Sequence, residues 1–195
     1  MYKTILADPA WKTCTGGSKG LAPHKHYPVQ TKDQVIDTMK SWLNQYPVLL
    51  EAHLYLWTLN SFSAGKSKGI LDGVEVCQAL GFKPITTIAW CKPQSNPTPY
   101  GQRGIELCIF ATRYRKGKGK EVMYKGTQNP ENVVGPGLSS SVDWFISNRR
   151  QHSRKPDEFY EYVEQRSQGP YLECYSRTTR PGWTAVGNQS GTWST

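Results

Sequence analysis

The sequence predicts an α/β domain in which a mostly parallel sheet carries helices on both faces. Short apolar segments rich in Ile, Leu and Tyr alternate along the chain with segments of helical periodicity. Such alternation is typical of parallel strands joined by crossover helices. The 195 residues contain no internal repeat and no clean linker, so residues 1–195 are expected to form a single domain.

The first half of the chain is predicted to form three strands and two helices. The strands are expected at 2–7, 52–59 and 85–91, and the helices at 31–43 and 69–81. Thr31, with Gln34 three residues later, has the pattern of a capping box at the start of the first helix. Gly81 is placed to end the second helix.

The second half is predicted to form four more strands and one helix. The strands are expected at 105–112, 142–147, 171–176 and 183–187, and the helix at 155–167. Pro156 stands at an early helical position that tolerates proline. The loops 8–30, 92–104 and 113–140 are expected beyond the carboxyl ends of the strands, where α/β folds bind their ligands.

The composition favours a polyanionic partner. The formal net charge is +9, and the segment 113–125 is strongly basic, with Glu121 as its single acid. A solvated loop would explain this segment equally well, and the two interpretations are compatible. The predicted nucleic-acid contacts are Arg103, Arg113, Arg115, Lys116, Lys118 and Lys120.

The sequence also bears on compartment. The five cysteines are widely spaced without a C-x-x-C pair, which indicates reduced thiols. We find neither an apolar run long enough for a membrane span nor a secretory signal. A cytoplasmic protein with no membrane partner is therefore expected.

Several common site motifs are incomplete. The Gly-Lys-Ser at 65–67 has Asn60 where a phosphate-binding loop needs glycine. His24 and His26 have no Cys or carboxylate cluster beside them, so no metal site is expected. A Ser or Cys nucleophile lacks a supporting G-x-S-x-G turn.

The stretch "ADPAW" after the first predicted strand suits recognition of an amino group on a heterocycle. The Asp8 carboxylate and the Pro9 carbonyl could each accept one N–H in the ring plane, and proline stiffens the turn between them. Trp11 offers a face on which a base could stack. The alternative interpretation is a strand-to-turn junction in which Asp8 caps the turn and Trp11 belongs to the core.

The motifs at the two ends of the chain together resemble one family. "ADPAW" resembles the D-P-P-[YFW] signature of adenine amino-group methyltransferases, and "HSRKPDEFYEYVE" at 152–164 and "LECYSRTTRPGWTAVGNQ" at 172–189 follow it in order. "HYPV", "LYLWTLN" and "GIELCIFATR" fall where the family has similar segments. The set resembles the family named for the seventy-kilodalton messenger-RNA adenosine methyltransferase subunit.

The resemblance implies a Rossmann-like fold in which the catalytic motif precedes the cofactor strand. It also implies methyl transfer from S-adenosylmethionine to the N-6 amino group of adenine in nucleic acid. Asp8 and Pro9 would hold the amino group, Trp11 would stack on the target ring, and Lys155 would meet the methionine carboxylate. The implied cofactor-binding set is Asp8, Lys155, Glu173, Arg177, Asn188 and Gln189.

This chemistry needs neither a nucleophilic residue nor a metal, because the methyl group leaves a sulfonium and catalysis is mainly alignment. Ala10 replaces the second proline of the motif and is expected to loosen the turn. By analogy with small family members, DNA is favoured as the substrate, RNA is the second possible substrate, and a homodimer is possible. The alternatives are a catalytically inactive nucleic-acid-binding scaffold on the same fold and a small-molecule N-methyltransferase, which the basic segment disfavours.

Overall fold

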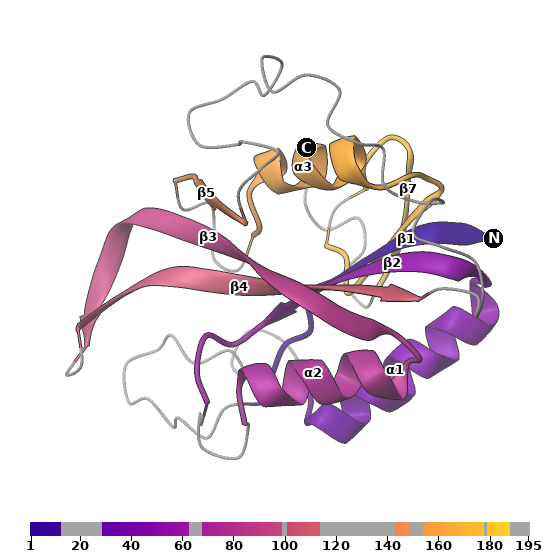
Figure 1. Cartoon of the computed structure of the whole chain (residues 1–195), viewed down its shortest axis with the longest axis horizontal. Helices are drawn as coiled ribbons and strands as arrows, with labels where there is room; N and C mark the ends of the chain where they lie inside the picture. The colour runs from indigo at the N-terminus through magenta and orange to yellow at the C-terminus, as the bar shows by residue number, and fades with distance from the viewer. Residues whose placement is uncertain are drawn as a thin grey trace.

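The computed structural model describes residues 1–12, 29–62, 68–98, 101–113, 143–148, 154–177 and 179–187. The strands in these ranges are β1 Tyr2–Ala7, β2 Val48–Thr58, β3 Lys83–Thr98, β4 Gly101–Arg113, β5 Trp144–Ile146, β6 Tyr171–Cys174 and β7 Trp183–Val186. The helices are α1 Lys32–Gln45, α2 Ile70–Ala79 and α3 Asp157–Arg166. The strands form one sheet of order β5-β3-β4-β2-β1-β6-β7 (Figure 1).

The sheet is parallel apart from one strand. β1 pairs in parallel with β2 and β6, β6 with β7, and β3 with β5. β4 is antiparallel to both of its neighbours, β2 and β3. The first strand of the chain therefore lies centrally, directly beside β6. These pairings confirm the predicted mostly parallel sheet.

Helices cover both faces of the sheet, as predicted. Figure 1 shows α1 and α2 on one side and α3 on the other. Ile5 and Ala7 of β1 belong to the core beneath α1 and α2, whereas Leu6 between them belongs to the core beneath α3. This alternation follows from the two-residue period of a strand, so β1 is buried on both faces.

The helix ends follow local chemistry. Thr31 and Gln34 form the expected capping box. After α2, Gly81 has a φ of 80°, Phe82 N–H donates to the Cys77 carbonyl at 2.9 Å, and Gly81 N–H donates to the Gln78 carbonyl at 3.0 Å. These bonds form a Schellman motif, which glycine favours because it adopts positive φ. None of the described helices is long and apolar enough to cross a membrane.

The prediction of a loop over 92–104 was wrong, because most of this segment forms a long hairpin of β3 and β4. β3 pairs with β5 only as far as Cys91, and β4 pairs with β2 only from Leu107 onward. Beyond these points no other strand in the described ranges pairs with the hairpin, so each of its two strands has an edge without a described partner. Proline is tolerated in this two-stranded part of the hairpin, because on an open edge its missing N–H costs no hydrogen bond of the ladder.

The loop after β4 also starts at another place than predicted. Arg113, the last residue of β4, pairs with Ala52 near the beginning of β2. Because β4 is antiparallel, the chain leaves it at the amino ends of the parallel strands. The segment 113–140 therefore begins at the edge of the sheet opposite the one where Asp8 lies, and 114–142 lies outside the described residues.

Candidate active site

The catalytic motif lies where the parallel strands end, which we call the carboxyl edge. Asp8 directly follows β1, between the ends of β2 and β6, and its N–H contacts the Cys174 carbonyl at 3.5 Å. Asp8 thus lies at the center of the edge where open α/β sheets bind ligands.

A row of alternating charges crosses this edge. Lys155, just before α3, donates to both carboxylate oxygens of Asp8 at 2.8 Å. Its Nζ also lies 3.2 Å from Oε2 of Glu106 on β4. Lys92 on β3 binds the other oxygen of Glu106. Lys155 thus links the end of β1 to β4, and Glu106 extends the row to β3.

Burial strengthens the electrostatic interactions between neighbouring charges in this row. The Lys155 side chain is only 11% exposed, and its ammonium group lies 5.0 Å from the ring center of Trp57. Burial disfavours the charge on Lys155, but Asp8 and Glu106 outweigh that effect and raise its pKa. Burial likewise acts to raise the pKa of Glu106, but Lys155 and Lys92 lower it to about 2. Lys155 and Glu106 are therefore both charged at neutral pH.

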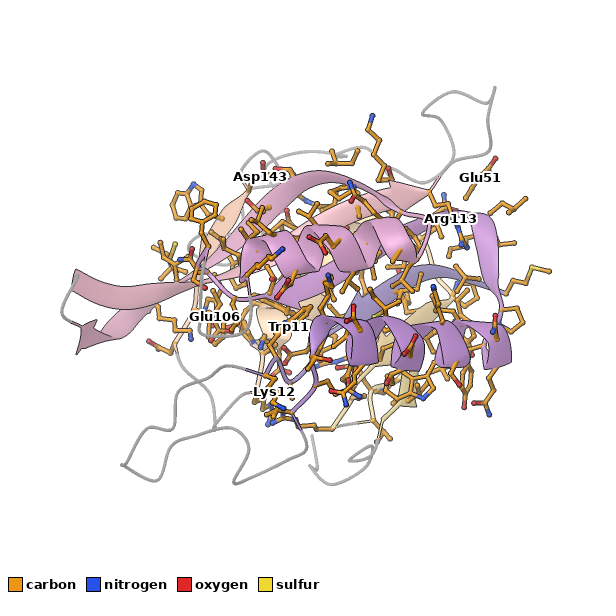
Figure 2. All side chains as sticks on the ribbon, turned by 90° about the horizontal axis from the view of Figure 1, so that it is seen from below. Trp11, Lys12, Glu51, Glu106, Arg113 and Asp143 are labelled. Atoms are coloured by element: carbon orange, nitrogen blue, oxygen red, sulfur yellow. The ribbon has the colours of Figure 1, made fainter. Side chains whose placement is uncertain are left out.

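Trp11 lies in the core beneath the motif and is not an open stacking face. It is 7% exposed, packs in the cluster under α1 and α2, and donates from Nε1 to the Trp57 carbonyl at 3.0 Å. Figure 2 shows it beside the start of α1. In this structure Trp11 occupies the core position of the alternative interpretation, and its stacking on a base stays a prediction. The backbone N–H of Trp11 donates to the Pro9 carbonyl at 3.0 Å, and this bond tightens the turn.

A buried carboxylate lies on the neighbouring strand β6. Oε1 of Glu173 accepts a hydrogen bond from the Tyr160 hydroxyl at 2.6 Å, and the Ser176 side chain also interacts with this carboxylate. Oε2 has no partner within hydrogen-bond geometry in the described part of the chain. Burial raises the pKa of Glu173. An unsatisfied buried acceptor costs about 1–3 kcal/mol, so this oxygen fits a hydroxyl donor on a ligand.

The structure thus brings Asp8, Pro9, Lys155 and Glu173 to one edge and places Arg177 in the turn that follows β6. Arg103 pairs with Asn96 in the hairpin, and its side chain lies outside the described residues. The remaining predicted positions also lie outside them: Asn188, Gln189, Arg115, Lys116, Lys118 and Lys120.

Arg113 does not belong to this edge. Its guanidinium lies over the Phe82 ring and donates to the Leu49 carbonyl at 2.7 Å. Figure 2 shows Glu106 and Arg113 toward opposite ends of the sheet. In this structure Arg113 therefore makes a structural contact near the start of β2.

Sequence reasoning missed Lys92 and Glu106. Glu106 stands inside the apolar run "IELCIF", and a carboxylate in such a strand is a usable signal, because buried charges are normally paired. Lys92 carried no comparable signal. The described ranges contain no group of three His, Cys, Asp or Glu placed to hold a metal ion.

The mostly parallel sheet and the site at its carboxyl edge define the class of doubly wound α/β folds, to which S-adenosylmethionine-dependent methyltransferases belong. The model of the MT-A70 family matches residues 2–189, so the chain belongs to this family, as the motifs suggested. Methyltransferases of this family use S-adenosylmethionine as methyl donor.

Curated relatives agree with this assignment. The chain is 27% identical to the human N(6)-adenosine-methyltransferase catalytic subunit METTL3, over 96% of this chain and 28% of that protein. It is 28% identical to a putative N(6)-adenosine-methyltransferase MT-A70-like protein of Medicago truncatula, over 96% of this chain and 26% of that protein. The chain therefore spans little more than a quarter of the length of these relatives.

Proposed function

We propose that this protein transfers a methyl group from S-adenosylmethionine to the N-6 amino group of adenine in nucleic acid. The observation that carries the proposal is the position of Asp8, at the center of the carboxyl edge and held by Lys155 at 2.8 Å. Family membership supports the same reaction. The names of the relatives specify adenosine as their substrate.

The base would bind at the Asp8–Pro9 turn. A carboxylate has about four lone-pair sites, so Asp8 can accept an amino N–H while it is bound to Lys155. The Pro9 carbonyl has a second lone pair beside the one that Trp11 N–H occupies. Two fixed acceptors would orient the amino nitrogen, and orientation is the main contribution this reaction needs.

The residues present fit the cofactor. Lys155 offers a buried cation for the methionine carboxylate, which would replace one of the three contacts that its ammonium now makes to Asp8 and Glu106. Oε2 of Glu173 offers an acceptor for a ribose hydroxyl. The resemblance adds Arg177, Asn188 and Gln189 to this side. The bound cofactor supplies an electrophilic methyl group on a sulfonium, so the chain itself contributes binding and alignment.

The polymer remains open between DNA and RNA. The net charge of +9 favours a polyanion in either case. The expected preference for DNA stays a prediction, because the relatives are named for adenosine, a ribonucleoside. The cytoplasmic location and the homodimer also stay predictions.

The test is to incubate the protein and S-adenosylmethionine with DNA or RNA, in separate reactions, and to identify the methylated nucleoside by mass spectrometry. N6-methyladenine in either polymer supports the proposal and identifies the polymer. Absence of methylation with normal cofactor binding by calorimetry would favour the inactive scaffold. Methylation of free nucleosides at the same rate as polymer would favour a small-molecule enzyme.

A further inference from the structure

The backbone of Gln30 forms two hydrogen bonds with the backbone of the catalytic turn. Its N–H donates to the Ala10 carbonyl at 2.8 Å, and its carbonyl accepts from Lys12 N–H at 2.8 Å. These bonds form a short parallel bridge between Gln30 and Trp11. Ala10 replaces the second proline of the family motif, so this bridge restrains a turn that lacks the stiffness of that ring.

The side chain of the same residue reaches the cofactor half of the site. Oε1 of Gln30 accepts from the Tyr175 hydroxyl at 2.8 Å, and Nε2 donates to the Thr38 hydroxyl of α1 at 2.9 Å. Tyr175 directly follows β6, and its ring packs edge-on against Trp42 with centers 4.8 Å apart. One glutamine therefore joins the turn after β1, the turn after β6 and helix α1.

Tyr175 has a strained backbone. Its φ is 64°, in the left-handed region that residues with a side chain rarely adopt. Such conformations persist when surrounding contacts hold them, and they occur often at functional sites. The hydroxyl contact to Gln30 and the ring contact to Trp42 are two such restraints, two residues beyond Glu173.

We propose that Gln30 is a positioning residue that couples the base-binding turn to the cofactor strand. The proposal rests on the function proposed above. A ligand that orders the turn at Tyr175 would steady the Ala10 carbonyl through Gln30, and with it Asp8 and Pro9. Coupling of this kind is reciprocal, so cofactor and nucleic acid would each strengthen the binding of the other.

The test measures that coupling directly. Calorimetry with S-adenosylhomocysteine, which lacks the transferable methyl, would be done with and without an adenine-containing oligonucleotide. The ratio of the two Kd values is the coupling factor. The variants are Gln30→Leu, which keeps the backbone bonds, Tyr175→Phe, which removes one hydroxyl, and the double variant. Gln34→Leu, a glutamine of the exposed capping box, is the matched control.

The wild type and Gln34→Leu are expected to show a coupling factor above one. Gln30→Leu and Tyr175→Phe should bring the factor close to one, and the double variant should add nothing further, because both changes break the same contact. kcat should fall about tenfold in Gln30→Leu, from misalignment of the turn, with a smaller change in KM.

Two results would overturn the proposal. One is a wild-type coupling factor of one. The other is an unchanged factor in Gln30→Leu with a lower melting temperature, which would make the residue merely structural. If the wild type shows coupling that Gln30→Leu removes but methylates neither DNA nor RNA, the proposed function fails while the coupling stands.

Discussion

At the scale of single residues, the ammonium group of Lys155 lies between two carboxylates and balances their negative charge. Asp8 and Glu106 both contact its ammonium group, and Trp57 lies behind it. Breaking a buried pair by removing one partner costs more than the pair contributes, because the remaining charge has lost both water and partner. Replacement of Asp8 and replacement of Glu106 should therefore have different effects, the first on methylation and the second on stability.

Replacement of Asp8 should separate binding from chemistry. In Asp8→Ala the base loses its acceptor while Lys155 keeps Glu106. Methylation should therefore be abolished, whereas cofactor affinity should fall only slightly, because Asp8 is one of six residues in the implied cofactor-binding set. Calorimetry and nucleoside mass spectrometry measure the two quantities. Asp8→Asn, which keeps the volume and one acceptor, tests whether charge itself is needed. Full activity in Asp8→Ala would show that the catalytic carboxylate is misassigned.

Replacement of Glu106 should lower stability in a pH-dependent way. The pKa of Glu106 is held at about 2, below the ordinary 4.5, so its ion pairs stabilise the fold above pH 4.5 and are lost as the pH falls toward 2. Because the side chain is partly exposed, we expect Glu106→Gln to lose only about 1–2 kcal/mol at pH 7.

Urea denaturation of wild type and variant at pH 7 and at pH 3 checks this effect, since the difference between them should shrink at the lower pH. The control is Glu75→Gln, which removes a surface pair with Lys32 and should change stability little. A Glu106→Gln deficit that is the same at both pH values would argue against the ion pairs as its cause.

At the scale of elements, α3 is attached to the sheet by a buried polar cluster at its carboxyl end. Nδ1 of His53 and Oγ of Ser167 share a hydrogen bond of 2.6 Å, and the Tyr55 hydroxyl lies 2.8 Å from the same Oγ. His53 also packs edge-on against Phe110. This contact holds the helix that Lys155 precedes, so it positions the site indirectly.

The cluster predicts acid sensitivity of the fold. Burial lowers the pKa of His53 from 6.5 to about 4, so the folded state keeps the ring neutral where the unfolded chain takes up a proton. The contribution of neutral His53 to the free energy of unfolding is fully present above pH 6.5. It falls as the pH drops toward 4, by on the order of 3 kcal/mol. Urea denaturation of wild type and His53→Leu between pH 7 and 4 measures the difference in slope.

The variant itself will be less stable at pH 7, because Ser167 loses a partner. The informative quantity is therefore the pH dependence, which should be flatter in His53→Leu than in the wild type. Equal slopes would mean that another group takes up the proton.

At the scale of the whole molecule, the direction of β4 decides which basic residues can reach the site. The hairpin of β3 and β4 extends from the carboxyl edge, whereas Arg113 lies at the opposite edge. Arg103 and Arg113 of the same strand therefore have different expected roles, although the sequence predicts the same nucleic-acid contact for both.

The two arginines form a matched pair of variants. Arg103→Gln should weaken oligonucleotide binding and reduce the salt dependence by about one phosphate contact. Arg113→Gln should leave binding unchanged and lower stability by about 1 kcal/mol, because the Leu49 carbonyl loses its donor. Affinity titrations at several salt concentrations, with urea denaturation, distinguish the two. The reverse pattern would contradict the assignment of the two edges.

Elements with local causes were predictable from the sequence. The capping box of Thr31 and the Gly81 turn depend on residues within one helical turn, and both were confirmed. The Asp8–Pro9 turn also follows from the strand before it. The positions of Trp11 and of the outer hairpin depend on which strands lie alongside, and no local pattern encodes that.

By itself the sequence determined the fold class, the family and the two motifs that flank the site, because periodicity and motif order are properties of the chain alone. Only the tertiary structure decided that Glu106 pairs with both Lys155 and Lys92, that Trp11 is core, and that Arg113 lies at the far edge. These outcomes depend on contacts between distant segments, whose burial and charge pairing exist only after the sheet has formed.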